Sequence, residues 1–319
     1  MEKPKVRISV RNLVEFILRS GDLDNSRGSS GDKEAMLKGG RLHRKIQRSM
    51  KGNYQAEVSL KRESEYEDTI IQVEGRADGI FTEDGEVWID EIKGTYGNLQ
   101  AMEMPVPVHR AQAMCYGWIY GEKEGLSQIG IQMTYSHLDT EDTRRFREIF
   151  SMEELKKWYQ ELLDAYHKWI AYSLSWKKER NASMTDLQFP FPYREGQREI
   201  VSGVYHTVSS KKTLFVQAPT GVGKTMSAIF PSVRAIGEGK GETLFYLTAK
   251  TITGTVAWEA FHTLRENGLK FKVTAITAKE KLCFLDSPEC TPEKCPYAKG
   301  HFDRVNDAVY ELWTTEEVY

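Results

Sequence analysis

The dipeptide Asp84-Gly85 lies between two segments in which polar and apolar residues alternate, and it predicts a tight β-hairpin. The turn needs positive φ at both central residues, which Asp and Gly accept. It also sets the register of the two strands, so that Asp78 lies opposite Glu91 and both point to one face of the sheet. Lys93 follows two residues after Glu91 and shares that face. The sequence therefore predicts two carboxylates and an amine side by side on one strand pair.

The chemistry of this group favours a divalent cation. Two opposed carboxylates repel each other unless a cation lies between them, and Mg²⁺ prefers oxygen ligands of this kind. A lysine beside the metal supplies positive charge or, with a lowered pKa, a base. Such a set suits phosphodiester hydrolysis, because a metal polarises the phosphate and lowers the pKa of a bound water. The alternative interpretation is a charged strand face on an antiparallel sheet, with Asp90 pointing to the opposite face.

The chain has 319 residues, enough for two domains, and a formal net charge of −2. This charge excludes a global basic excess, so any nucleic-acid surface must be local. No apolar run reaches the roughly 20 residues of a membrane span, and the N-terminus has no apolar signal-peptide core. Four cysteines without a secretory signal indicate a reducing compartment, so we expect a cytoplasmic protein that does not contact a membrane.

Periodicity and capping residues outline the first domain. Ser9 caps a helix, and Ser151 and Glu154 form a capping box that opens a long amphipathic helix. We expect this long helix to end near residues 178–180 and a linker to follow over 181–188. The other predicted elements are helices at about 38–50 and 108–120 and strands at about 53–62, 68–80, 86–94 and 128–135.

The pattern changes after this linker, so we predict two domains, 1–182 and 183–319. In the second, an apolar strand at 213–218 precedes a glycine-containing loop. Further strands are expected at 243–248 and 271–276, alternating with helices. This alternation is typical of a parallel sheet in an α/β domain.

The loop Ala218–Thr225 has the composition of a phosphate-binding loop between a strand and a helix. Gly221 and Gly223 would let backbone N–H groups cradle the phosphates of ATP. Lys224 would reach the outer phosphates, and Thr225 would hold Mg²⁺. The first position is Ala rather than the usual Gly, and the alternative is a glycine loop that binds no nucleotide.

Three cysteines lie close together in the sequence, namely Cys283, Cys290 and Cys295. Thiolates at such spacing can bind an iron–sulfur cluster or zinc. Three ligands are one short of the usual four, and Cys115 belongs to a helix of the first domain. The alternative is three unconnected thiols.

The first domain resembles a RecB-family PD-(D/E)XK nuclease. Its characteristic elements occur in order, as Gly40–His43, Gly75–Asp78, Asp90–Lys93 and Gln112–Tyr116. The resemblance implies a restriction-endonuclease-like mixed sheet flanked by helices, with a Mg²⁺ or Mn²⁺ site. It also implies that His43, Asp78 and Glu91 bind the metal and that Lys93 is catalytic. Gln112 and Tyr116 would then lie near the DNA.

Two of these residues also have plainer interpretations. Helical spacing places Gln112 and Tyr116 on one face, whatever their function. A lone helical histidine such as His43 is more often an ordinary surface or core residue, and a Gln/Tyr pair is usually packing.

The second domain resembles the beginning of a superfamily 2 DNA helicase of the DinG/XPD type. Phe191–Arg194 with Gln197 is similar to the entry motif of that family, in which the glutamine helps to read adenine. Ala218–Thr225 resembles its Walker A loop, and Tyr246–Thr251 resembles the next motif, which touches DNA. The resemblance implies a partial RecA-like P-loop parallel α/β domain. The three cysteines lie where that family inserts its four-cysteine [4Fe–4S] domain.

These patterns predict a metal-dependent DNA nuclease fused to an incomplete ATP-dependent helicase that processes single-stranded DNA in repair or defence. No D-E-A-H-type box follows the phosphate loop, so we expect an N-terminal fragment or a truncated gene product in which only the nuclease turns over. We expect a longer parent protein to bind a [4Fe–4S] cluster, and we expect this chain to bind it poorly or not at all. The alternatives are a non-catalytic fragment that binds nucleic acid and ATP, and a standalone ATPase. Cleavage polarity and oligomeric state are not predicted.

Overall fold

The structure, a computed structural model, describes residues 3–25, 33–50, 52–249, 252–285 and 289–315. The chain forms two compact units, and each is described by itself. Unit 1 comprises Met1–Ala171 and Cys283–Tyr310, and unit 2 comprises Tyr172–Leu282 and Glu311–Tyr319. The predicted functional division at residue 182 stays a prediction, but the cysteine-containing segment lies in unit 1.

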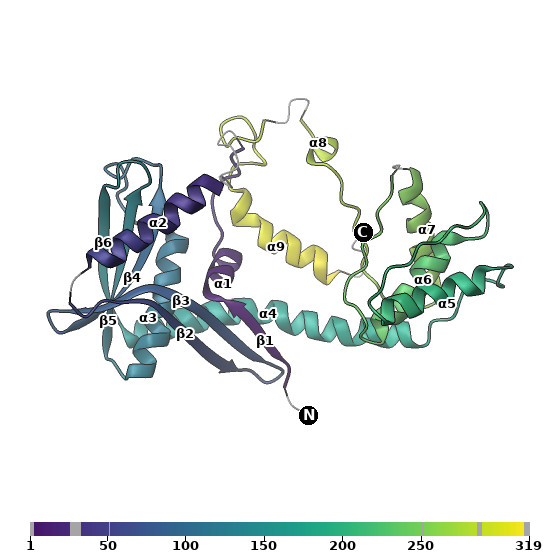
Figure 1. Cartoon of the computed structure of the whole chain (residues 1–319), viewed down its shortest axis with the longest axis horizontal. Coiled ribbons are helices and arrows are strands. Elements are labelled where there is room, and N and C mark those ends of the chain that lie inside the picture. Colours follow the sequence, from purple (N-terminus) through teal and green to yellow (C-terminus); the bar gives the residue numbers. More distant parts are fainter. Residues whose placement is uncertain (1–2, 26–32, 51, 250–251, 286–288, 316–319) are drawn as a thin grey trace. The chain divides into compact units, whose positions relative to one another are not determined.

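Unit 1 is built on a six-stranded mixed sheet with strand order β1-β3-β4-β5-β6, and β2 pairs with β3 (Figure 1). The pairs β1–β3 and β4–β5 are parallel, and the others are antiparallel. The strands are β1 (Lys5–Ser9), β2 (Gln55–Glu65), β3 (Ile70–Glu83), β4 (Glu86–Thr95), β5 (Gln128–His137) and β6 (Thr143–Ser151). The flanking helices are α1 (Val10–Ile17), α2 (Lys33–Ser49), α3 (Pro107–Glu124) and α4 (Met152–Thr185).

The predicted hairpin is confirmed. Asp84 and Gly85 have φ of 51° and 86°, which is the mirror-image turn that matches the twist of the strands. Phe81 pairs with Trp88, and their rings stack with centroids 6.4 Å apart. The register that places Asp78 opposite Glu91 is therefore the register of the pair.

The long strand β3 has a gap along one of its edges. Its first residues pair with β1 as far as Glu74, and its pairing with β4 begins only at Gly79. Residues 75–78 therefore pair with neither β1 nor β4 on this edge, although β2 pairs with β3 along the opposite edge. This gap, between the end of one partner strand and the beginning of the next, is where the predicted site residues meet.

The predicted helix caps form as expected. The Ser9 hydroxyl accepts a hydrogen bond from the Asn12 backbone N–H at 3.1 Å. Ser151 and Glu154 exchange the two bonds of a capping box, with Glu154 Oε2 2.9 Å from the Ser151 backbone nitrogen. Both caps depend on a few adjacent residues, which is why sequence reasoning finds them.

Two features of unit 1 differ from the predictions. The long helix α4 does not end near residue 180 but continues to Thr185, through the expected linker. The reason is tertiary, because Met184 is completely buried in a hydrophobic core. The strands β1 and β6 were not predicted, since β1 has only five residues and both lie at edges of the sheet.

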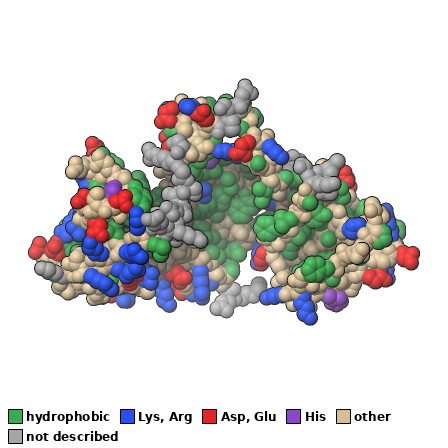
Figure 2. Space-filling model, turned by 45° about the horizontal axis from the view of Figure 1, so that its top comes forward, with side chains coloured by type: hydrophobic (Ala, Val, Ile, Leu, Met, Phe, Trp, Pro, Cys, Tyr) green, Lys and Arg blue, Asp and Glu red, His purple; other side chains and the backbone are tan. Residues whose placement is uncertain are grey.

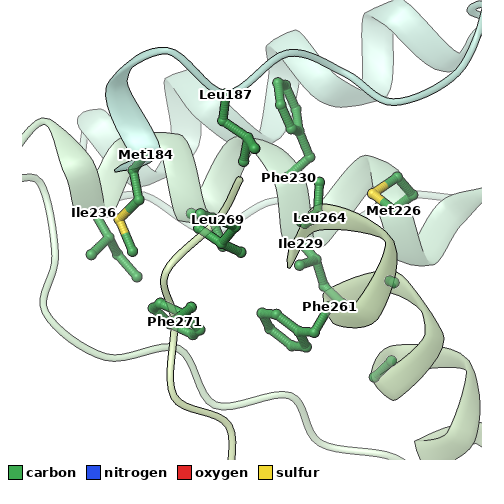
Figure 3. Close-up of a cluster of buried hydrophobic side chains, with 13 residues drawn as sticks. Met184, Leu187, Met226, Ile229, Phe230, Ile236, Phe261, Leu264, Leu269 and Phe271 are labelled. Atoms are coloured by element: carbon green, nitrogen blue, oxygen red, sulfur yellow. The ribbon is translucent and has the colours of Figure 1, made fainter. Parts of the chain in front are cut away.

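Unit 2 is mostly helical in the part that the structure describes. Helix α6 crosses its core and packs against α7 and the end of α4, as Figure 3 shows for side chains such as Ile229, Phe261 and Met184. Its helices after α4 are α5 (Gln197–Ser209), α6 (Lys224–Gly237), α7 (Ile252–Glu266) and α8 (Lys279–Leu282). Most of the last helix, α9 (His301–Thr314), belongs to unit 1. None of the helices in the described ranges combines the length and apolar character that crossing a membrane requires.

The three strands predicted for the second domain are wrong. Within the described residues, the stretches 213–218, 243–248 and 271–276 form no strand and belong to no sheet. An apolar stretch becomes a parallel strand only where neighbouring strands pair its backbone and helices cover both faces. Here Phe215, Leu247 and Ile276 are 93%, 88% and 91% exposed, so that cover is missing. The mixed α/β class is confirmed for unit 1, whereas the RecA-like sheet stays a prediction without strands to support it.

Replacement of Gly130 by alanine tests the packing of the sheet. A Cβ at Gly130 would lie 2.3 Å from the Trp88 ring, beside the hairpin. We predict that Gly130→Ala lowers the free energy of unfolding by about 1–3 kcal/mol, because the ring is held in the core. The matched control is Gly39→Ala in α2, where a Cβ meets nothing within 4 Å. This change should raise stability by up to about 1 kcal/mol, because alanine favours a helix. Equal urea midpoints for the two variants would contradict this packing.

Candidate active site

Lys93 is held between two acceptors at the centre of the site. Its Nζ lies 2.7 Å from Glu91 Oε1 and donates to Gln112 Oε1 at 3.1 Å. Glu91 and Lys93 come from β4, and Gln112 comes from α3. The ammonium group is therefore held by two side-chain acceptors, one on its own strand and one on α3.

The second residue of the helical pair extends this chain of contacts into the gap in β3. The Tyr116 hydroxyl accepts hydrogen bonds from the Gln112 side chain and from the backbone of Arg76. The ring fits because Gly75 has no side chain, since a Cβ there would lie 2.7 Å from the hydroxyl oxygen. Burial, the largest cause, raises the pKa of Tyr116 to about 12, so the hydroxyl stays protonated. The predicted pair does share one face and joins α3 to β3.

The Asp78 side chain makes the hydrogen bond that replaces a backbone–backbone bond at the point where the pairing of β3 with β4 ends. Its Oδ2 accepts a hydrogen bond from the Ile92 backbone N–H at 2.7 Å. Its Oδ1 lies 3.6 Å from His43 Nδ1, and its backbone carbonyl accepts a bond from the Gln47 amide at 2.9 Å. His43 and Gln47 both belong to α2. Leu42 of the same helix packs against Ile92 of β4. The structure therefore brings the three predicted metal ligands into one neighbourhood.

Glu91 is the most unusual side chain of the site electrostatically. It is 1% exposed, and its Oε2 has no hydrogen-bond partner among the residues that the structure describes. Burial, the largest cause, and the nearby Asp78 carboxylate raise the pKa of Glu91 to about 8, although Lys93 lowers it. Desolvation and the like charge thus outweigh the ion pair with Lys93. A buried acceptor without a donor beside a second carboxylate is the arrangement that a cation would relieve.

The donor set fits a divalent metal in its chemistry. Carboxylate oxygens are the ligands that Mg²⁺ prefers, and an imidazole makes Mn²⁺ a suitable partner as well. In the geometry of the described residues, however, no three His, Cys, Asp or Glu side chains are close enough together to hold a metal ion. His43, Asp78 and Glu91 are therefore neighbours, and their role as ligands stays a prediction.

Asp90 points away from Glu91, as the hairpin register predicts, and joins a separate buried network. It accepts hydrogen bonds from the Thr134 hydroxyl at 2.6 Å, the Gln132 amide at 3.0 Å and the Tyr54 hydroxyl at 3.1 Å. Burial raises the pKa of Asp90. This network anchors β4 to β5 from the other side, and sequence reasoning did not find its partners.

Sequence reasoning also missed two residues that fix the beginning of α3. The Tyr135 hydroxyl accepts a hydrogen bond from the Val106 backbone N–H at 2.9 Å and lies 3.1 Å from His109 Nδ1. Burial and the nearby Lys93 lower the pKa of His109 to about 4, so the ring is neutral. No local sequence signal marks this contact, because it depends on β5 lying beside β4.

The loop Ala218–Thr225 of unit 2 leads into a helix as predicted, but the strand expected before it is absent from the described residues. Gly221 and Gly223 have φ of 88° and 80°, and Gly223 caps the N-terminus of α6. The Lys224 ammonium donates to the Ala218 and Pro219 carbonyls at 3.0 and 2.8 Å. The lysine thus bonds to carbonyl groups of its own loop. Its contact with nucleotide phosphates stays a prediction.

Gln197 lies against this loop. It is 4% exposed, its Oε1 accepts from the Arg194 backbone N–H at 3.0 Å, and a Cβ on Gly223 would meet its Nε2 at 2.5 Å. The Tyr246 hydroxyl donates to the Thr225 hydroxyl at 3.3 Å. The structure therefore brings the predicted adenine reader and the loop together. Residues 250–251 of the predicted DNA-touching motif lie outside the described residues.

The cysteines belong to unit 1, whereas the loop Ala218–Thr225 belongs to unit 2. Cys290 and Cys295 are buried in a small cluster with Ala298, whereas Cys283 is partly exposed. The segment docks on the N-terminal region, because the Leu23 N–H donates to the Ala298 carbonyl at 2.9 Å. In the described ranges, the three thiols do not form a ligand group, and an iron–sulfur cluster stays a prediction.

Three comparisons with known proteins give little. No protein-family model matches the chain. A stretch of 47 residues is 40% identical to a probable ATP-dependent helicase of Methanocaldococcus jannaschii, and it spans 14% of this chain and 7% of that protein. The crystal structure of SSO0001 aligns with a TM-score of 0.33 at 20% identity, over 51% of this chain and 78% of that chain. The chain thus covers a small part of the helicase that it matches, and a TM-score this low does not establish a shared fold.

The raised pKa of Glu91 predicts a pH-dependent stability. The folded state holds a proton on Glu91 up to about pH 8, whereas the unfolded carboxyl releases it near 4.5. The folded state therefore binds more protons across this window, and stability falls as pH rises through it. We predict that Glu91→Gln, measured in EDTA, gains a few kcal/mol over the wild type between pH 6 and 9. Parallel stability curves for the two proteins would show that Glu91 is not a protonated buried acid.

Proposed function

We propose that unit 1 is a metal-dependent phosphodiesterase that cleaves single-stranded DNA. The observation that carries this proposal is the buried Glu91 Oε2, which has no donor and lies near Asp78, while Oε1 is held by Lys93. A structural carboxylate would be expected to have its hydrogen bonds satisfied. A bound Mg²⁺ or Mn²⁺ would polarise the scissile phosphate and lower the pKa of the attacking water.

The residues of the chain then have distinct roles. Asp78, Glu91 and His43 would hold the cation, as their donor types allow. Lys93 would orient the attacking water and balance the charge on the phosphate oxygens. Gln112 keeps the ammonium of Lys93 in place through their 3.1 Å hydrogen bond.

The basic face of α2 supports a nucleic-acid substrate. Arg41, Arg44 and Arg48 are exposed and follow the spacing of one helical stripe. Among the residues that the structure describes, none of the three forms an ion pair, so their charge is available to phosphates. The same helix carries His43 on its inner side. Figure 2 shows Lys and Arg side chains gathering on one face of unit 1, in a chain with a net charge of only −2.

For unit 2 the proposal is nucleotide binding as part of a helicase motor. Its support is the phosphate loop at the N-terminus of α6, with Gln197 packed against Gly223. The short similarity to a probable ATP-dependent helicase agrees with this proposal. In an intact motor, ATP-driven movement would deliver single-stranded DNA to the nuclease. The alternative is a non-catalytic form of this chain that binds nucleic acid and ATP.

Cleavage of end-labelled single-stranded DNA tests the nuclease. We predict products with Mn²⁺ or Mg²⁺, and none with EDTA. Asp78→Ala and Lys93→Ala should each lower the rate by about 10²-fold or more, because the first removes a metal ligand and the second removes a positive charge beside the reacting phosphate. Lys61→Ala, which removes an exposed lysine from β2, serves as the matched control and should cleave like the wild type.

Undiminished cleavage by a folded Lys93→Ala variant would sink the assignment of the site. Binding of the labelled DNA without products from the wild type would favour the non-catalytic alternative. The product ladder would also give the polarity of cleavage.

Binding of a fluorescent ATP analogue tests the phosphate loop. We predict that the wild type binds the analogue and that Lys224→Ala binds it at least about tenfold more weakly, because the lysine is the cation nearest the phosphates. Lys240→Ala, which removes an exposed lysine just after α6, is the control. Equal affinities for the two variants would show that the loop holds no nucleotide phosphate.

A further inference from the structure

A cavity opens where two parallel strands of unit 1 end. β4 and β5 are paired up to Thr95 and His137, and the chain leaves β4 at Tyr96. The cavity has a volume of about 740 Å³, within the roughly 300–1,000 Å³ of small-molecule sites. The carboxyl ends of parallel strands are where open α/β sheets bind their ligands. Its lining includes Tyr96, Asn98, Gln100, His137 and Arg144.

The walls of this cavity are held by hydrogen bonds. Arg144 donates through one Nη1 to the carbonyls of Leu99 and Gln100 at 3.0 and 2.9 Å. The Leu138 N–H donates to the Thr95 carbonyl at 2.9 Å, and the Leu99 side chain is buried. A ligand would therefore meet a preformed site and would not have to order the loop after β4.

The lining has the chemistry of a base-stacking site. The Tyr96 ring is 51% exposed, although it lies in a cavity and not on a convex surface. It meets the His137 ring edge-to-face, with centroids 6.4 Å apart at 88°. Exposed aromatic rings in a groove are the platforms on which proteins stack unpaired bases, and the amides of Asn98 and Gln100 can pair with base edges.

His137 is fixed in one orientation. Its Nδ1 accepts hydrogen bonds from the backbone N–H groups of Asp139 and Thr140, at 3.3 and 3.2 Å. These two bonds fix the plane of the ring. The pair of rings is thus positioned, and the Lys38 Nζ lies 5.9 Å from the centroid of the Tyr96 ring while it pairs with Asp139 at 3.0 Å.

The cavity lies within reach of the nuclease site. Tyr96 follows Lys93 by three residues at the end of β4, so their Cα atoms are at most about 10 Å apart at roughly 3.3 Å per residue. This distance corresponds to about three nucleotides at the 3.4 Å stacked rise of a DNA strand. Lys38 belongs to α2, the helix that also carries the exposed arginines. A DNA strand that runs along α2 would therefore pass the Tyr96 ring within a few nucleotides of the proposed cleavage site.

We propose that this cavity is a subsite for a single unstacked base of single-stranded nucleic acid, with Tyr96 as its stacking platform. The inference rests on the proposed function, because it places the base within a few nucleotides of the scissile phosphate. Asn98 and Gln100 line the site at the base edge, and Arg144 keeps its walls in place. The amides of Asn98 and Gln100 would set the preference of this subsite for one base over another.

The test uses single-stranded DNA that carries 2-aminopurine, whose fluorescence falls when it stacks, at each position in turn. Binding is measured in EDTA, so that no strand is cleaved. We expect quenching at one or two adjacent positions with the wild type. Tyr96→Leu should lose this quenching and bind about tenfold more weakly, and Tyr96→Phe should retain both. Tyr297→Leu, at another exposed tyrosine of unit 1, should behave like the wild type.

A second measurement changes the DNA instead of the protein. An abasic site at the quenched position should weaken binding to the wild type about tenfold and leave binding to Tyr96→Leu unchanged. Uniform quenching along the strand, or equal sensitivity of both proteins to the abasic site, would overturn the subsite. Metal-dependent cleavage without positional quenching would refute only the subsite. Positional quenching without cleavage would refute only the nuclease.

Discussion

The hydrogen bond from the Ile92 backbone N–H to the Asp78 carboxylate is the contact on which the site of unit 1 depends. It lies where β3 and β4 stop exchanging ladder bonds, and at 2.7 Å it replaces the bond that the backbone no longer makes. By the same contact, Asp78 stays near Glu91 on one side and near His43 on the other. The gap in the sheet is thus closed by Asp78, and it is also where the carboxyl groups of Asp78 and Glu91 lie near Lys93 and His43.

Keeping Glu91 buried beside Asp78 is unfavourable for the protein alone. A buried acceptor without a donor costs about 1–3 kcal/mol, and a like charge nearby adds to this. Lys93 offsets part of the cost, but the pKa of Glu91 remains raised to about 8. Strain of this kind is usually found where a ligand relieves it, which connects the electrostatics of the site to the proposed metal. The separate Asp90 network shows the contrast, because that carboxylate receives three hydrogen bonds.

Sequence reasoning succeeded where the determinant is local. The Asp84-Gly85 turn sets the strand register through two residues, and the caps at Ser9 and Ser151 depend on residues three positions away. It failed where pairing or burial is decided far along the chain. The apolar stretch around Leu247 has the composition of a strand but no pairing partner in the described residues, and α4 continues because Met184 is buried. The basic stripe of α2 was readable from helical spacing, whereas the cavity at Tyr96 requires knowing that β4 and β5 are parallel.

Binding of Mn²⁺ to the intact chain, followed by calorimetry, tests the metal site most directly, because it does not depend on any substrate. We predict one site in the wild type that is lost in Asp78→Asn and in Glu91→Gln. The site should be retained in Glu161→Gln, which removes an exposed carboxylate from α4. No binding by the folded wild type, or equal binding by all four proteins, would contradict the account, and the Asp78–Glu91–Lys93 group would then be a charged face of the sheet.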